Sequence, residues 1–190
     1  MPAKLDIINA ALTRAGARGV NFSASGSPGA QVADAAYTRC RDYCLSLYPW
    51  PFALRLVKLA RAAEAPAFGE RYACALPGDC VRVVAAEGED GRSLRYRIVG
   101  NSLHTDAEAV NLRYVSNSRD VPMSEAFADA LAWRLAFEIS PYLEQGGGNA
   151  QNFFQLFEQA LDRAKADADA QDNPDPARWS SLFLRERRVN

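Results

Sequence analysis

The side chains that could carry chemistry are few, and their spacing completes no site. Cys40 and Cys44 are four residues apart, so a helix would place both thiols on one face, a spacing that a metal ion could use. The sequence holds one histidine, His104, and no second ligand pair at a zinc spacing, so we do not expect a structural zinc site. Buried thiols that act as small apolar side chains are the simpler interpretation.

A second arrangement would join His104, Asp106 and Cys80 into a Cys-His-Asp set. The sequence does not bring the three into contact, and we expect His104 in a turn, where a solvated imidazole is the ordinary outcome. The glycines at 146–148 precede a helix but lack the preceding strand and the Lys-Ser/Thr pair of a phosphate loop. We therefore predict no catalytic, cofactor-binding or metal-binding residues, and expect that the chain is not an enzyme.

Aromatic residues gather where a helix gives way to a strand. Tyr48, Trp50 and Phe52 lie within five residues, separated by Pro49 and Pro51. Two interpretations remain open for this junction. The three rings form a hydrophobic plug between helices and sheet, or they belong to an oligomer interface, where tryptophan and tyrosine are enriched.

The last residues form a second candidate contact region. Pro174 and Pro176 exclude a continuing helix, which favours an extended arm over residues 173–190. The arm combines apolar side chains, typical of binding surfaces, with arginines that would suit an acidic groove. We predict that it docks on another protein; a disordered end and nucleic-acid binding by the arginines are the alternatives. The predicted docking residues are Arg178, Trp179, Leu182, Phe183, Leu184 and Arg185.

Composition indicates an ordinary soluble globular chain. The 190 residues are enough for one domain with a real core, which 48% hydrophobic and 24% charged residues support. A net charge of −1 predicts no general attraction to nucleic acid or to a membrane surface. The N-terminus lacks the apolar run and cleavage site of a signal peptide, so we expect the four cysteines to be reduced in the cytosol.

Hydrophobic periodicity supplies the framework that positions these residues. The third helix is apolar nearly all round and so predicts the core of the fold. Its charged residues exclude a membrane span, Ser124 offers an N-cap, and Pro141 should kink or end it. Between the second and third helices, alternating residues over 52–116 predict a small antiparallel meander. The predicted helices span residues 4–15, 28–48, 124–143 and 149–171.

The predicted fold class is therefore α+β. It consists of an antiparallel bundle of about four helices, an inserted small antiparallel β-sheet and an extended C-terminal arm. We expect residues 1–172 to form one domain and residues 173–190 to form the arm.

Several stretches, taken in order, resemble the tail tubular protein A family, the head-to-tail adaptors (gatekeepers) of T7-like short-tailed bacteriophages and related prophages. The resemblance runs from about Leu5 to Leu161 and is most specific at residues 50–53 and 76–83. It does not cover the tail after Asn173. The stretches that carry it are INAALTRAGA, RDYCLSLYPWPFALRLVKLA, YACALPGDCVRV and SEAFADALAWRLAFEI.

This resemblance implies a structural virion protein that needs no cofactor and no membrane. Its members form a ring, expected to be dodecameric, between the portal protein and a tail nozzle similar to tail tubular protein B. Viral DNA passes through the lumen without sequence-specific binding, and a nearly neutral chain agrees with a channel that does not grip phosphates. The expected location is the head-tail junction of the virion, and the host cytoplasm during assembly.

The C-terminal arm lies outside this resemblance; from its own side chains we expect it to dock on a neighbouring subunit or on the portal. Two other functions remain open. One is a different phage tail-completion or assembly protein. The other is a soluble hydrolase or ligand-binding module that uses the region of His104.

Overall fold

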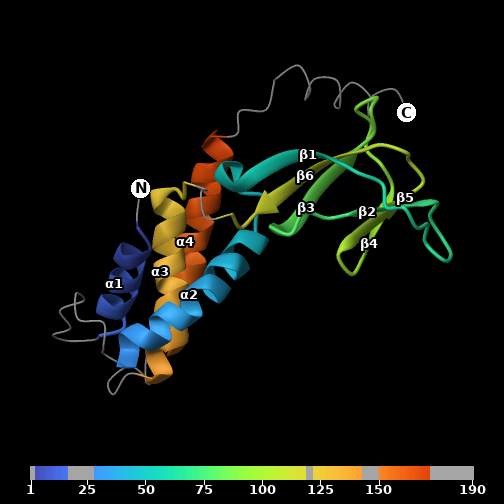
Figure 1. The fold of residues 1–190 in the computed structure, drawn as a ribbon. Helices are drawn as coiled ribbons and strands as arrows, with labels where there is room; N and C mark the ends of the chain where they lie inside the picture. Colours follow the sequence, from blue (N-terminus) through green and yellow to red (C-terminus); the bar gives the residue numbers. More distant parts are fainter. Residues whose placement is uncertain (1–2, 17–27, 119–121, 143–149, 172–190) are drawn as a thin grey trace.

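A bundle of four helices carries two small β-sheets at one end. The computed structural model describes residues 3–16, 28–118, 122–142 and 150–171 (Figure 1). Both three-stranded sheets are antiparallel, which confirms the predicted α+β class. The helices are α1 (Lys4–Arg14), α2 (Pro28–Ser46), α3 (Glu125–Ile139) and α4 (Ala150–Gln171).

The ends of the helices follow from local chemistry. At the start of α3, the Ser124 hydroxyl accepts a hydrogen bond of 3.2 Å from the backbone N–H of Phe127, as expected of an N-cap. Gly16 follows α1 with a φ of 84°, a left-handed conformation that glycine adopts without strain. Helix α3 ends at Ile139 rather than 143, because Pro141 turns the chain into the 3-10 helix η2 (Ser140–Tyr142).

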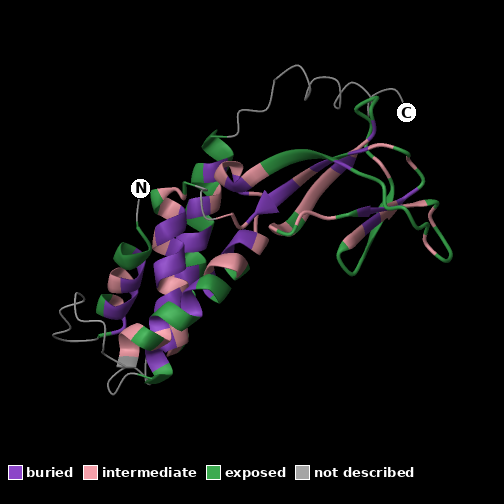
Figure 2. Cartoon of the chain, in the orientation of Figure 1, coloured by how far each residue is buried: buried purple, intermediate pink, exposed green. Residues whose placement is uncertain are grey.

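Helix α3 is the centre of the bundle, as its sequence predicts. Helices α1, α2 and α4 each pack against it, and buried residues line its length in Figure 2. Phe127, Leu131, Leu135 and Ile139 are fully buried. Burying each of these side chains contributes about 2 kcal/mol relative to solvent exposure, so this one helix accounts for much of the core.

The strands form two sheets rather than the single meander that the sequence predicts. Next to the bundle, β1 (Leu54–Leu59), β6 (Val110–Ser116) and β3 (Cys80–Glu87) form one sheet in the order β1-β6-β3. Farther out, β2 (Tyr72–Ala75), β5 (Ser102–Thr105) and β4 (Tyr96–Val99) form the other, in the order β2-β5-β4 (Figure 1). The meander prediction is wrong in strand order because β6, with the most buried residues, takes the central position.

Two local predictions about the strands are also wrong. Gly100, with a φ of 59°, lets the chain reverse within a few residues, so Ser102–Thr105 forms strand β5 and His104 lies in a strand, not in a turn. Phe52 does not begin the first strand. It lies in the 3-10 helix η1 (Pro51–Ala53), which Pro51 initiates.

The two sheets enclose a small core of their own, separate from that of the bundle. It includes Leu59, Cys74, Leu103, Val110 and Leu112. Val115, one position from the end of β6, belongs instead to the larger core that contains the helices. Strand β6 therefore connects the two cores. None of the helices in the described part of the chain is long and apolar enough to cross a membrane.

Candidate functional site

The aromatic junction between the helices and the sheets is built around Trp50. This side chain is 0% exposed, and its indole Nε1 donates a hydrogen bond of 2.9 Å to the backbone oxygen of Cys44. The ring centroid lies 4.9 Å from that of Phe127 and 5.2 Å from that of Tyr48, both in edge-to-face geometry. The ring centroid of Phe52 also lies 5.1 Å from that of Phe127, which belongs to α3. The rings thus join η1 to α2 and α3.

The flanks of this junction reach two further elements. The Tyr48 hydroxyl donates a hydrogen bond to the carboxylate of Asp169, which holds the last turns of α4 beside the junction. Arg82 on β3 donates from Nη1 to the backbone oxygen of Ser46 at 3.1 Å. Trp50 is completely covered within the chain, whereas Tyr48 and Phe52 are half-buried and keep some surface.

A carboxylate in the turn between β2 and β3 fixes the end of β6. Asp79 accepts hydrogen bonds from the Ser116 hydroxyl at 2.5 Å and the Tyr114 hydroxyl at 3.1 Å, and its backbone oxygen accepts from the N–H of Asn117 at 3.0 Å. The side-chain amide of Asn117 in turn donates a hydrogen bond of 3.0 Å to the carboxylate of Asp42 on α2. Desolvation raises the pKa of Asp79, but the hydrogen bonds from Ser116 and Tyr114 outweigh it and hold this pKa below its usual range.

This network was not predicted from the sequence. The partners lie more than 30 residues from Asp79, and only strand pairing brings them together. An aspartate that follows Pro-Gly in a turn was the single local signal, and it is shared with many turns that bind nothing.

The cysteines predicted as small apolar side chains occupy that role. Cys40 and Cys44 are buried in the bundle. Desolvation raises the pKa of the Cys44 thiol to about 12 and also raises that of Cys40, so both are protonated near neutral pH. Protonated thiols are poor nucleophiles and poor metal ligands. Within the described ranges, no group of three or more His, Cys, Asp or Glu could hold a metal ion.

The structure does not assemble His104, Asp106 and Cys80 into a site. Cys80 packs against the small core that contains Leu103. His104 follows Leu103 in β5 and so projects from the opposite face of the strand. The Asp106 carboxylate accepts a hydrogen bond of 3.0 Å from the backbone N–H of Arg71 instead.

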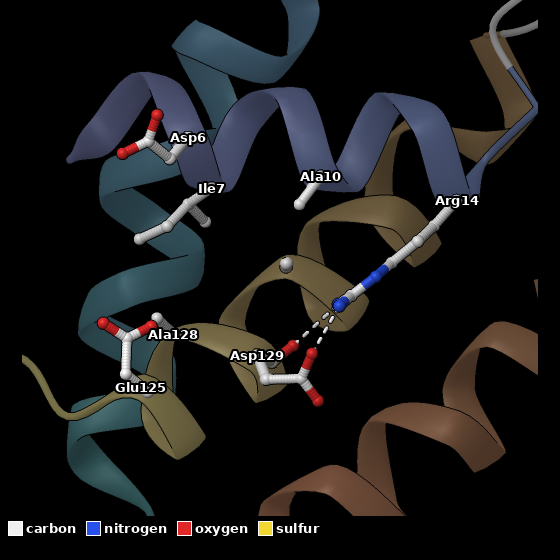
Figure 3. A pocket seen from close by; sticks show the side chains of 8 residues that line it. Asp6, Ile7, Ala10, Arg14, Glu125, Ala128 and Asp129 are labelled. Carbon is white, nitrogen blue, oxygen red and sulfur yellow. Dashed lines mark hydrogen bonds and ion pairs between the residues drawn. The ribbon is translucent and has the colours of Figure 1, made fainter. Parts of the chain in front are cut away.

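An acidic groove between α1 and α3 was not anticipated from the sequence (Figure 3). Arg14 lies at one end, where it donates from Nη1 to the backbone oxygen of Asp129 at 3.0 Å and pairs with the Asp129 carboxylate. Its guanidinium also lies 4.4 Å from the ring centre of Trp133. The groove has a volume of about 210 Å³, and its lining comprises Asp6, Ile7, Ala10, Arg14, Glu125, Ala128, Asp129 and Ala132.

The β-sheets expose large apolar side chains at their edges. Strands β1 and β4 each have a partner on one side only in the described sheets. Leu56 on β1 is 77% exposed, and Phe68, in the segment between β1 and β2, is 87% exposed. Every residue of β4 is exposed, including Tyr96, Ile98 and Val99. Unpaired edges with apolar side chains are templates for contact with another chain.

The predicted docking arm, residues 173–190, lies outside the described residues, and so do all six of its candidate contacts. They are Arg178, Trp179, Leu182, Phe183, Leu184 and Arg185. Comparison with models of protein families gives no match to this chain, and comparison with curated proteins gives none either.

Proposed function

We propose that this chain is a structural, ring-forming head-to-tail adaptor of a short-tailed bacteriophage, which connects the portal to the tail nozzle and lines the DNA ejection channel. The observation that supports it is the pair of exposed, apolar edge strands, β1 and β4, on a protein with a well-buried helical core. The sequence resemblance to tail tubular protein A suggests which assembly those edges serve.

Two different edges on one subunit favour assembly into a ring. The free N–H and C=O groups of an edge strand can pair with a strand of another chain, and Leu56 and Ile98 can lose their exposed apolar surface in the same contact. A contact between unlike surfaces of identical subunits is heterologous, and it generates a closed ring when the rotation between subunits allows closure.

The remaining parts of the proposal concern partners and chemistry. The portal and the nozzle are the protein partners, the virion head-tail junction is the location, and DNA passes through without sequence-specific contacts. The net charge of −1 agrees with this passage, because a chain without excess positive charge attracts DNA phosphates only weakly. We propose no catalytic role, because Cys80 packs against the core that contains Leu103, whereas His104 projects from the opposite face of β5.

Electron microscopy and sedimentation of the full-length protein, alone and mixed with the portal of its own phage, test this function. We expect rings that bind portal. Leu56→Lys and Ile98→Lys should weaken assembly while the circular dichroism spectrum and the melting temperature stay unchanged, because both side chains are exposed. Ala65→Lys, which adds the same charge to an exposed residue between β1 and β2, is the matched control and should assemble normally.

A chain that remains monomeric with and without portal would contradict the proposal. Rings that bind another tail component but not portal would instead support the alternative of a different tail-completion protein.

A further inference from the structure

We propose that the groove between α1 and α3 binds the C-terminal segment of the same chain, residues 174–190. This inference does not depend on the proposed function, since it concerns the free subunit. It follows from the chemistry of the groove, the chemistry of the segment and the position at which α4 ends.

The floor of the groove is apolar and made largely of small side chains. Ala128 and Ala132 on α3 are buried, Ala10 on α1 is half-buried, and Ile7 closes the floor with an exposure of only 2%. Three alanines in contact positions leave the space of about 210 Å³ that larger side chains would have filled. Such a floor suits apolar side chains supplied from outside the bundle.

The walls of the groove carry an excess of negative charge. Among the lining residues that the structure describes, Asp6, Glu125 and Asp129 contribute three carboxylates and Arg14 contributes one cation (Figure 3). The Arg14 guanidinium is already paired with Asp129. The formal charge of the lining is therefore −2, and a ligand with both apolar and cationic side chains complements it.

The end of this chain has that combination of side chains. Residues 174–190 contain four arginines against Asp175 and Glu186, a formal side-chain charge of +2. The run Leu182–Leu184 is apolar and is followed directly by Arg185. We assign the apolar run to the alanine floor, and Arg185 and Arg187 to the acidic wall of the groove.

The segment begins at the correct end of the bundle. The hydrogen bond from Tyr48 to Asp169 holds the C-terminal turns of α4 at the aromatic junction, and the contact of Trp50 with Phe127 holds the start of α3 there too. Asp6 and Glu125, near the starts of α1 and α3, lie at this same end (Figures 1 and 3).

The intervening chain is long enough to reach the groove. From the end of α4 across α3 to α1 is about two helix spacings, roughly 20 Å. The ten residues 172–181 can span up to about 33 Å when extended. The same chain therefore supplies the segment at a high effective concentration, which favours it over a second copy or another protein.

Photo-crosslinking of the full-length protein tests this assignment. A benzophenone amino acid in place of Phe183 should crosslink to peptides from residues 4–14 or 125–132, located by mass spectrometry. An equal mixture of unlabelled and ¹⁵N-labelled protein separates the cases, because crosslinks within one chain never combine the two labels. We expect crosslinks within one chain.

Two variants address the groove and the segment independently. Ala10→Phe fills the groove, and the double variant Arg185→Glu, Arg187→Glu reverses the charge of the segment; each should lower the crosslink yield about tenfold, corresponding to a loss of about 1.4 kcal/mol. Ala35→Phe, at an exposed position of α2, is the matched control and should keep the yield. If Ala10→Phe lowers the melting temperature, the double variant becomes the decisive test, because both arginines come after α4 in the sequence and the described core of the bundle is built without them.

Crosslinks that map to the β-sheets, that join only different chains, or that persist in both variants would overturn the assignment. A tail docked on a second copy would give mixed-label products. A tail that needs a partner protein would give no groove crosslinks in the free subunit.

Discussion

The indole of Trp50 and the backbone oxygen of Cys44 form a hydrogen bond of 2.9 Å in the interior of the protein. Residue 44 lies in the last turn of α2, and residue 50 lies within the connection to β1, directly before η1, so this bond fixes the angle at which the chain leaves the bundle. The buried oxygen and the buried indole N–H satisfy each other, which removes the cost of burying either alone.

Trp50→Ala should therefore destabilise the subunit itself. Loss of a fully buried ring and of its hydrogen bond is expected to lower the free energy of unfolding by about 3–5 kcal/mol, measured as a lower denaturant midpoint and melting temperature. Trp50→Phe keeps much of the apolar contact and should lower the free energy of unfolding by less than Trp50→Ala does. Unchanged thermal stability together with failed self-association would assign the residue to an interface instead.

Asp79→Asn should destabilise the protein in a pH-dependent way. At pH 7 the carboxylate accepts hydrogen bonds from Ser116 and Tyr114, and its replacement should cost about 1–2 kcal/mol. The folded pKa is lowered, so the contribution of Asp79 is present above its unfolded value of about 3.9 and is lost as pH falls through the folded pKa. The two proteins should therefore differ most above pH 5 and converge in acid. A constant difference down to pH 2 would contradict this assignment.

The thiols should differ in reactivity according to burial. In native protein at pH 8, a chromogenic thiol reagent should modify Cys80, which is half-buried, well before Cys44, whose pKa of about 12 keeps it protonated. All four should react in denaturant. Metal analysis of the purified protein should find no stoichiometric zinc; one equivalent of metal, lost on Cys40→Ser, would show that the metal interpretation was correct.

Deletion of residues 175–190 tests the docking arm within the proposed function. Helix α4 ends at Gln171, so the shortened chain should fold and keep its circular dichroism spectrum. We expect it not to attach to portal-bearing heads, because the arm would leave its own groove to bind a neighbouring subunit or the portal. Normal attachment of the shortened protein would exclude a docking role for the arm. It would not test the binding of the segment in the groove of the free subunit, which the crosslinking experiment addresses.

The sequence predicts the helices better than the sheets, for a physical reason. Helix α3 is determined by local signals: its apolar surface, the Ser124 cap and the Pro141 stop all lie within the element or beside it. Strand β5 has only four residues, of which Leu103 and Thr105 are buried, too few for an alternating pattern to stand out. Its pairing depends on the turn at Gly100, which joins it to β4, and on β2, which lies much earlier in the chain.

The candidate sites also differ in whether their residues are neighbours in the sequence. The aromatic junction was visible because Tyr48, Trp50 and Phe52 are neighbours in sequence. The groove was not, because Arg14 and Asp129 are 115 residues apart and neither has an unusual local context. Small residues such as Ala10 give no sign of whether they allow close helix packing or leave a space.

The register of β1 with β6 has a consequence for how this fold can vary. Leu54 and Val115 are Cα partners at the boundary between bundle and sheets, so the chain leaves and re-enters the bundle at points about 5 Å apart. Besides this junction, the β region contacts the bundle through β3, whose Val81 and Val84 pack against the helical core. The outer sheet, β2-β5-β4, contributes none of the described residues to the bundle core, so a longer, shorter or different module could replace that sheet without altering the order or packing of the four helices.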